Sequence, residues 1–336
     1  NLVILHKEKH LSCLKRIHLE KMVLKTLKFL ETLIQQIKED TVAFCDDDAQ
    51  QKELRIAKII LQIDEDCKTN KTDTLFDLLQ HQNINIIVAV LQVLKCLSSL
   101  TKNEDIARKI QIMIIKSCKE HNCILIVKVH QLLKEVQFVI SKMKESEWES
   151  VLKAIEHNIT AALDAISLLC DRQQKEMQDA MQNASNNGLD IVNRISFMLF
   201  YISKKCNGRT VIIAQKTVQA LIEMCTGNYN NQKIAIDSQV IVSINQILTE
   251  ARTENSEPQG KRELHSSCFE LLEVILEKDS PTLANCIANH LEVENLLKEM
   301  RQSWQSDRPR SCTVLIRAYH VLKKIADYKC LSLDQL

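Results

Sequence analysis

The sequence predicts an all-α protein, an armadillo/HEAT-like α-solenoid of about fourteen to seventeen helices. Three observations support this fold class. Only 4 glycines and 3 prolines occur among 336 residues, and aromatic residues make up 4%, so turn formers are few and a β-rich fold is disfavoured. Apolar residues recur at helical spacing along most of the chain. A pattern of long helix, polar corner and shorter helix also repeats about every 50 residues.

The helices are predicted from stripes of apolar residues, which lie on one helix face and are expected to be buried. Two clear stripes are Val88, Leu91, Leu94, Leu97 and Leu100, and Ile155, Ile159, Ala162, Ile166 and Leu169. Short polar stretches between the stripes predict the helix boundaries. In chain order these stretches are Thr41–Gln51, Cys67–Thr74, Thr101–Asp105, Lys119–Cys123, Lys144–Glu147, Asn183–Gly188, Lys204–Thr210, Thr226–Asn231, Thr253–Lys261, Lys278–Pro281 and Ser306–Pro309.

Three of these corners follow one another at a near-constant period. The segments "AISLLCDRQQKEM", "ALIEMCTGNYNNQ" and "ELLEVILEKDSPT" each end a long apolar helix, turn, and begin a shorter one. Cys170 and Cys225 are 55 residues apart, and Cys225 and Glu277 are 52 apart. Helical units of this length bury their apolar faces only against their neighbours, and the extended surface that results usually binds other proteins.

Composition excludes several classes of function. The formal net charge is +1, from 44 basic and 43 acidic residues, so the basic excess of a nucleic-acid-binding protein is missing and no nucleic-acid partner is expected. The longest apolar run, Ile84–Leu94, is too short for a membrane span and contains two amides. The 13 cysteines are odd in number and spread singly along the chain, and most of them lie in apolar runs. They are expected to be reduced core residues of a cytoplasmic protein.

Two groups of residues are candidates for metal binding. Cys118, His121, Cys123 and His130 lie close together, but their spacing is not that of a zinc site, and a packed helix corner is the competing interpretation. Cys45–Glu53 and Asp64–Cys67 are acidic stretches; the first has no glycine and its acids are consecutive rather than alternating, unlike those of a calcium loop.

No phosphate-binding glycine motif and no GxSxG nucleophile motif occurs in the sequence. We therefore expect a protein that is not an enzyme, with no catalytic residues, no cofactor and no bound metal.

The corner "EMCTGNYNNQKIAI" is the most informative stretch. Gly227 stands where a helix C′ residue takes positive φ, two positions after Cys225. Asn231 and Gln232 are then expected to open the next helix, where their amides can satisfy its unpaired N–H groups and bridge to the preceding helix end. The sequence thus predicts a structural helix corner at Cys225, Gly227, Asn231 and Gln232. A ligand-binding loop is the alternative.

This stretch also resembles the RIH-associated (homology-associated) helical domain of inositol trisphosphate receptors and ryanodine receptors. In that family, too, a long helix ends in an acid, one residue, a cysteine and then a glycine, and an Asn-Gln pair and an apolar helix follow. The corresponding residues here are Glu223, Cys225, Gly227, Asn231, Gln232 and Ile234. With the neighbouring segments "AISLLCDRQQKEMQDAMQNASNN" and "CFELLEVILEKDSPTLANCIANHLEVENLLKEM", the resemblance covers about residues 147–329.

The resemblance implies a division of the chain. We expect helical repeats without clear assignment in residues 1–145 and RIH-associated-like helical repeats in residues 146–336. At the place of the family's glycine-rich insertion this chain has only "SKKCNGRT". The parts of the receptors that bind inositol trisphosphate or conduct calcium have no counterpart here, so no ligand or pore residue can be carried over.

Two functions are compatible with these patterns. The first is a non-catalytic cytoplasmic scaffold that binds other proteins along its solenoid surface within a large cytoskeletal or ciliary (axonemal) assembly. The alternative, which the resemblance implies, is the cytosolic coupling solenoid of an inositol trisphosphate/ryanodine receptor-like calcium-release channel, located on the cytosolic face of the endoplasmic reticulum.

The cysteine pattern gives a first test. In denaturant, titration of reactive thiols should count all 13 cysteines, because isolated cysteines in a reducing compartment do not form a disulfide framework. Metal analysis of the same sample should find no stoichiometric zinc. Several missing thiols, or one zinc per chain, would show that the interpretation is wrong.

Overall fold

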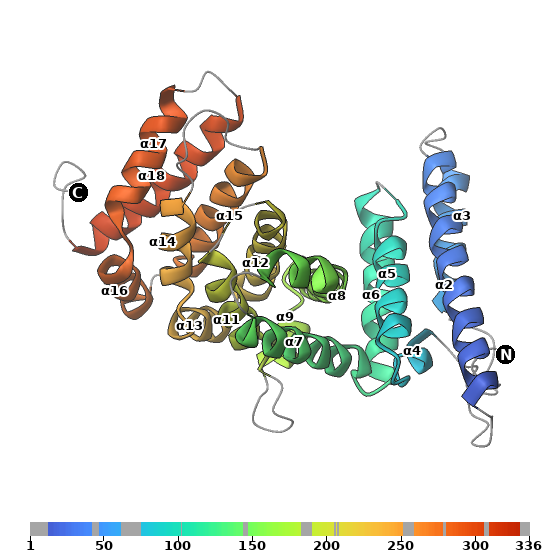
Figure 1. Ribbon diagram of the computed structural model, residues 1–336. Helices are drawn as coiled ribbons and strands as arrows, with labels where there is room; N and C mark the ends of the chain where they lie inside the picture. Colours follow the sequence, from blue (N-terminus) through green and yellow to red (C-terminus); the bar gives the residue numbers. More distant parts are fainter. Residues whose placement is uncertain are drawn as a thin grey trace. The chain divides into compact units, whose positions relative to one another are not determined.

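The computed structural model describes residues 13–41, 47–61, 75–101, 103–143, 147–182, 190–204, 206, 208–250, 259–277, 280–305 and 309–329. In these ranges the chain forms sixteen α-helices and no strand (Figure 1). The predicted all-α solenoid is therefore confirmed, and its helix count falls within the predicted range. The chain divides into two compact units, Asn1–Leu132 and Leu133–Leu336, and the division falls within α7 (Ile124–Lys142).

Unit 1 is built from pairs of helices. Before α7 it contains α2 (Cys13–Thr41), α3 (Asp47–Leu61), α4 (Leu75–Leu78), α5 (Ile84–Ser98) and α6 (Glu104–Glu120). Helix α2 packs on α5, α3 packs on α6, and α4 and α6 both contact α5. The predicted stripe from Val88 to Leu100 is buried in this core, together with Phe76 and Ile110.

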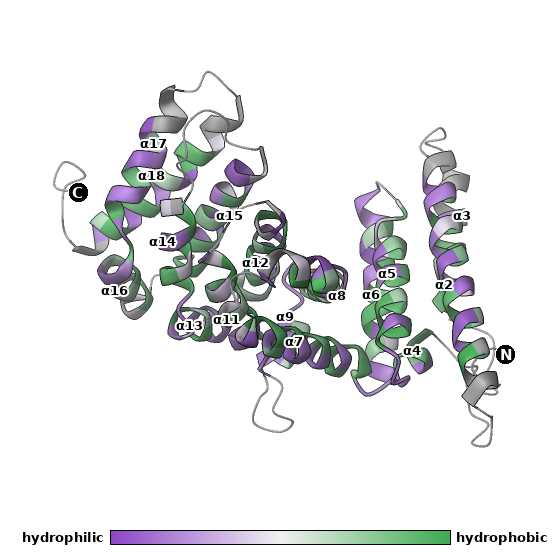
Figure 2. Ribbon diagram, viewed as in Figure 1, coloured by the Kyte–Doolittle hydropathy of each residue, from purple (hydrophilic) through white to green (hydrophobic). Residues whose placement is uncertain are grey.

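Unit 2 is an array of repeats. After α7 it contains α8 (Trp148–Cys170), α9 (Lys175–Gln182), α11 (Ile191–Ser203), α12 (Arg209–Cys225), α13 (Tyr229–Asp237), α14 (Val240–Glu250), α15 (Gln259–Ile275), α16 (Pro281–His290), α17 (Val293–Gln305) and α18 (Pro309–Lys329). Figure 2 shows hydrophobic and hydrophilic residues on the same helices, as expected for helices that bury one side.

The repeats of unit 2 each contain three helices. A short first helix (α9, α13, α16) leads to a second (α11, α14, α17) and then to a long third (α12, α15, α18). Equivalent helices stack on one another: α9 on α13 and α13 on α16, α11 on α14 and α14 on α17, and α8 on α12, α12 on α15 and α15 on α18. This stacking is the armadillo-like arrangement that the sequence period predicts.

Polar side chains replace glycine and proline at many helix starts. Asn83, Asn103, Asp190, Asn228 and Ser280 are N-caps, and each accepts a hydrogen bond from a backbone N–H of the following helix. An N-cap of this type stabilises a helix by about 0.5–2 kcal/mol. These caps explain how a chain with so few turn formers still makes short corners.

The sequence also led to predictions about membrane spans and about a division of the chain. None of the helices in the described ranges is long and apolar enough to cross a membrane. The division near residue 145 into two kinds of repeat stays a prediction.

Candidate functional site

The candidate site is the corner between α12 and α13, at the centre of unit 2. Helix α12 ends at Cys225, and the N–H of the C-cap residue Thr226 donates to Ile222 O at 2.9 Å. Gly227 follows with φ of +69°, the left-handed conformation that side chains disfavour. The chain can therefore reverse direction within a few residues, and α13 begins at Tyr229.

Asn231 and Gln232 lie at this corner with no exposed surface. Asn231 Nδ2 donates to Met224 O at 2.8 Å and to Gln178 O at 3.2 Å. Gln232 Nε2 donates to Cys225 O and to Val274 O, both at 3.0 Å. The two amides thus supply hydrogen-bond donors to carbonyls at the C-terminal ends of α12 and α15, which no helix can satisfy internally.

Only the donor half of each amide has a protein partner. Asn231 Oδ1 and Gln232 Oε1 have no hydrogen-bond partner among the described residues. This asymmetry explains the residue types, because a carboxylate of the same size would offer no donor and would repel the carbonyl oxygens. The corner therefore requires Asn and Gln rather than Asp and Glu.

Gln178, on α9, completes the corner from the preceding repeat. Its Nε2 donates to Glu223 O at 2.7 Å and to Thr226 O at 3.0 Å. Gln178 and Gln232 are 54 residues apart and occupy equivalent places in consecutive repeats. Each lies on a short first helix and donates a hydrogen bond to a carbonyl at the end of the next long third helix. Each glutamine thus ties the first helix of its repeat to the end of that repeat's third helix, and Gln232 also reaches Cys225 O at the end of the preceding repeat.

The sequence did not identify Gln178, although its spacing from Gln232 matches the repeat period.

The sequence also placed the start of α13 too late. Asn228 is the N-cap, and its Oδ1 accepts from Asn231 N at 3.3 Å. Asn231 and Gln232 lie within the first turns and bond to carbonyls, so the expectation that they satisfy unpaired N–H groups was wrong. The reason is that the last carbonyls of α12 still lack intrahelical donors, whereas Asn228 already accepts from an N–H group of α13.

Two acids border the corner. Gly227 N donates to Glu277 Oε2, and Asn228 Nδ2 donates to Asp179 Oδ1, both at 2.9 Å. Asp179 comes from α9, in the repeat that ends with α12, and Glu277 lies just beyond α15, the last helix of the repeat that begins with α13. The corner is therefore fixed by polar contacts from the repeat before it and the repeat after it.

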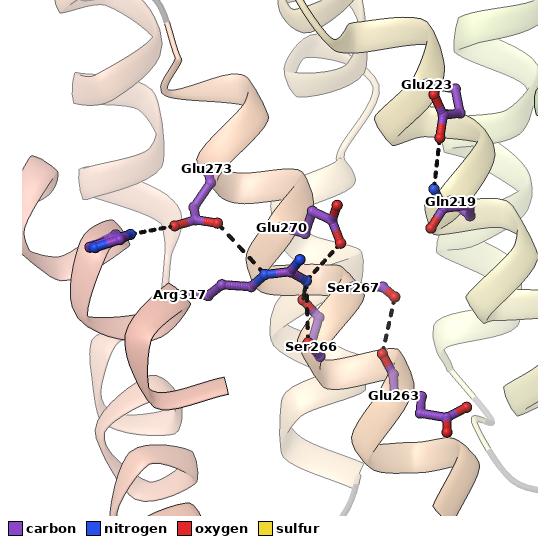
Figure 3. Close-up of polar contacts among 9 residues, drawn as sticks. Gln219, Glu223, Glu263, Ser266, Ser267, Glu270, Glu273 and Arg317 are labelled. Carbon is purple, nitrogen blue, oxygen red and sulfur yellow. Dashed lines mark hydrogen bonds and ion pairs between the residues drawn. The ribbon is translucent and has the colours of Figure 1, made fainter. Parts of the chain in front are cut away.

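The long third helices present a polar face beside this corner. We call it the third-helix face and define it by the side chains on one side of α12, α15 and α18: Ile212, Lys216, Gln219, Glu223, Glu263, Ser266, Glu270, Glu273, Ile316, Arg317 and His320. Figure 3 shows its central part. Arg317 Nη1 bonds Glu270 Oε2 at 2.6 Å, and His320 Nδ1 lies 2.9 Å from Glu273 Oε1.

A similar arrangement joins α8 to α12, where Arg209 bonds Glu156 at 2.7 Å and Lys216 bonds Asp164. Basic residues of one third helix thus meet acids of the one before. Half-exposed pairs of this kind each contribute about 0–1 kcal/mol, so they favour one order of repeats more than they stabilise the fold.

Glu223 departs from this pattern of opposite charges. Gln219 Nε2 donates to its Oε1 at 2.8 Å. Burial raises the pKa of the Glu223 carboxyl above its usual value, the Gln219 hydrogen bond lowers it, and the nearby acids Asp171 and Glu270 raise it further. At the junction of α12 and α15 an acid therefore faces an acid.

The cysteines near the corner have the properties of core residues. Cys170, Cys225 and Cys268 are fully buried. Burial raises the pKa of all three thiols, that of Cys225 to about 12. Thiols with raised pKa values are poor nucleophiles and poor metal ligands near neutral pH.

The metal-site candidates of the sequence lie elsewhere. Cys118, His121 and Cys123 form the corner between α6 and α7, where His121 stacks on Phe76 with ring centroids 5.3 Å apart and its Nδ1 lies 2.7 Å from Ser117 O. Within the described ranges no three His, Cys, Asp or Glu side chains cluster as metal ligands would. Asp64–Cys67 and residues 42–46 lie outside the described residues.

Comparison with known proteins bears on this region. Residues 153–248 match the family described as RyR and IP3R Homology associated. The match runs from α8 into α14 and includes the corner, so the predicted resemblance to this domain is confirmed. No curated protein matches the chain.

One solved structure supports the fold, and a second has a slightly lower TM-score. An engineered protein from the Northeast Structural Genomics Consortium is similar with a TM-score of 0.51 and 14% identity, covering 91% of this chain and 97% of that chain. A second engineered protein from the same consortium has a TM-score of 0.49 and 15% identity, covering 89% and 98%. At such identity the first similarity concerns the fold alone.

Replacing Asn231 by alanine should destabilise the protein. The substitution removes the side-chain donor of Met224 O, a carbonyl in the last turn of α12 that is buried at the corner, and a stranded buried group costs about 1–3 kcal/mol. Thermal unfolding followed by circular dichroism should show a melting temperature lower by several degrees. The matched control is Asn230→Ala, which removes the adjacent, exposed amide and should change little. Equal melting temperatures for the two variants would contradict a structural role for Asn231.

Glu223→Gln should alter how stability depends on pH. A carboxyl whose folded pKa is raised favours the folded state most below its unfolded pKa, and this contribution is lost as pH rises through the folded pKa. The variant, which keeps an oxygen for Gln219, should therefore be relatively more stable near pH 7 than near pH 4. Denaturant unfolding at both values measures this, with the exposed Glu120→Gln as charge control. An unchanged pH dependence would contradict the raised pKa.

Proposed function

We propose that this chain is a non-catalytic helical scaffold that binds other proteins along its repeats, as part of a cytoskeletal or ciliary assembly in the cytoplasm. The observation that supports this most is the interlocking of repeats by Asn231 and Gln232 of α13, which donate to the end of α12 in the preceding repeat. Gln178 and Gln232 also hold the end of the third helix in their own repeats. A stack joined in this way keeps the third-helix face continuous over several repeats.

The chemistry of the third-helix face supports the same role. Its acids and bases are largely engaged with each other, as in the contacts of Arg317 with Glu270 and Ser266. Ile212 and Ile316 are about half exposed at 49% and 55%. A face of mixed charge with a few exposed apolar side chains suits reversible protein contacts.

A second candidate function is favoured by the match of residues 153–248 to the receptor-associated family. In this alternative the solenoid is the cytosolic coupling element of an inositol trisphosphate/ryanodine receptor-like calcium-release channel. The same interlocked corners would then transmit ligand-driven movement from repeat to repeat. The two functions differ in where the protein resides and in whether its loss alters calcium release.

Proximity labelling in ciliated cells distinguishes the two. With the chain fused to a labelling enzyme, the labelled neighbours should be cytoskeletal or axonemal proteins. The double variant Ile212→Glu, Ile316→Glu should lose many of them, because charge is placed at the exposed apolar points of the third-helix face. Ile59→Glu, at a position of unit 1 that is 65% exposed, serves as control.

Two results would contradict the scaffold proposal. One is labelling confined to endoplasmic reticulum channels, together with altered calcium release when the protein is depleted, which would favour the alternative. The other is an unchanged set of neighbours for the double variant, which would remove the third-helix face from the proposal.

A further inference from the structure

Helix α2, in unit 1, has two apolar faces, and among the described residues only one of them packs on another helix. Leu19, Val23, Leu27 and Ile34 are buried, and α2 packs on α5. This face accounts for the place of α2 in the fold. A second set of apolar residues on the same helix takes no part in it.

The second face follows the spacing of a coiled coil. Met22, Thr26, Phe29 and Leu33 are separated by four, three and four residues, the spacing of the a and d positions of a heptad repeat. Met22, Phe29 and Leu33 are 45%, 65% and 38% exposed. We call these four residues the α2 seam.

Thr26 is apolar in effect, although it carries a hydroxyl. Its Oγ1 donates to Met22 O at 3.0 Å, within its own helix. Because the hydroxyl is satisfied there, the methyl group is the part of the side chain left for a partner. The seam thus offers four consecutive apolar contact points.

Lysines flank one edge of the seam. Lys21, Lys25 and Lys28 are exposed, and none of them forms an ion pair with an acid of the described residues. Lys25 occupies a heptad g position, from which charged side chains reach across to a partner helix. The partner is therefore expected to carry acids along the facing edge.

The width and charge of the seam argue against two other occupants. Helices that lie on membranes bury a wide apolar face, whereas an a and d stripe alone is the narrower seam of helix pairing. A second copy of this chain in antiparallel orientation would bring the lysine edges of two seams together, and like charges at such positions disfavour pairing. In parallel orientation the g-position Lys25 would face the e-position Leu30, which offers no acid.

We propose that the α2 seam binds an amphipathic helix of a partner protein that has leucine-type residues at its a and d positions and acids along one edge. The inference rests on the proposed function in one respect, that this chain acts by binding proteins. It assigns to unit 1 a site separate from the third-helix face of unit 2.

The test uses the full chain and two synthetic helical peptides of about 20 residues. Both peptides have leucine at a and d positions; one has glutamate and the other lysine at e and g positions. Fluorescence anisotropy should show that the glutamate peptide binds at least about tenfold more tightly, with a difference that shrinks at high salt. Phe29→Ser combined with Leu33→Ser should abolish binding without lowering the melting temperature, because both side chains are exposed.

The unit 2 variant Ile212→Glu, Ile316→Glu serves as the second control and should bind the glutamate peptide normally. Its result separates failure of this inference from failure of the proposed function. Equal affinity for the two peptides, or undiminished binding by the seam variant, would overturn the inference. So would seam-dependent binding to phosphatidylserine vesicles in place of the peptide, or a sedimenting dimer that the seam substitutions dissociate.

Discussion

The fold of unit 2 depends on donors for the carbonyl groups at the ends of its long helices. The last carbonyls of an α-helix have no partner inside the helix, and burying them unpaired is costly. Here α12 ends inside the protein, at the fully buried Cys225. Amide side chains of α9 and α13 supply the missing donors. Gln232 bonds the ends of both α12 and α15, so the corner helps to fix the spacing of these two third helices.

The same solution recurs with other residues. Asn245 Nδ2 donates to His290 O at 2.7 Å, and Lys324 Nζ donates to Leu276 O at 2.8 Å. In each case a side chain of one helix completes the end of a helix some 45 to 48 residues away. The scarcity of glycine and proline is thus matched by donors taken from neighbouring repeats. Repeats joined in this way depend on one another, as expected of a solenoid.

Local patterns made most of the fold predictable. The stripe from Val88 to Leu100 and the position of Gly227 follow from helix geometry within a few residues. The partners of the corner did not follow, because Gln178 is 45 residues from Glu223 and only the stacked repeats bring them together. The choice of Asn228 as the N-cap was hidden for another reason: three asparagines and a glutamine stand within five positions, and sequence alone does not say which amide meets which end.

The charged residues of the third helices are also arranged to interact with the adjacent helix of the stack. A net charge of +1 conceals an arrangement in which α12 presents bases to α8, and α18 presents bases to α15. Between α12 and α15 the pKa of Glu223 is raised, first by burial and further by the nearby acids Asp171 and Glu270. That junction is therefore joined by apolar packing and by Gln232, which reaches Val274 O, rather than by ion pairs. Complementary charge thus helps to define the order of helices at the α8–α12 and α15–α18 junctions. At the α12–α15 junction the hydrogen bonds of the amide corner take this role.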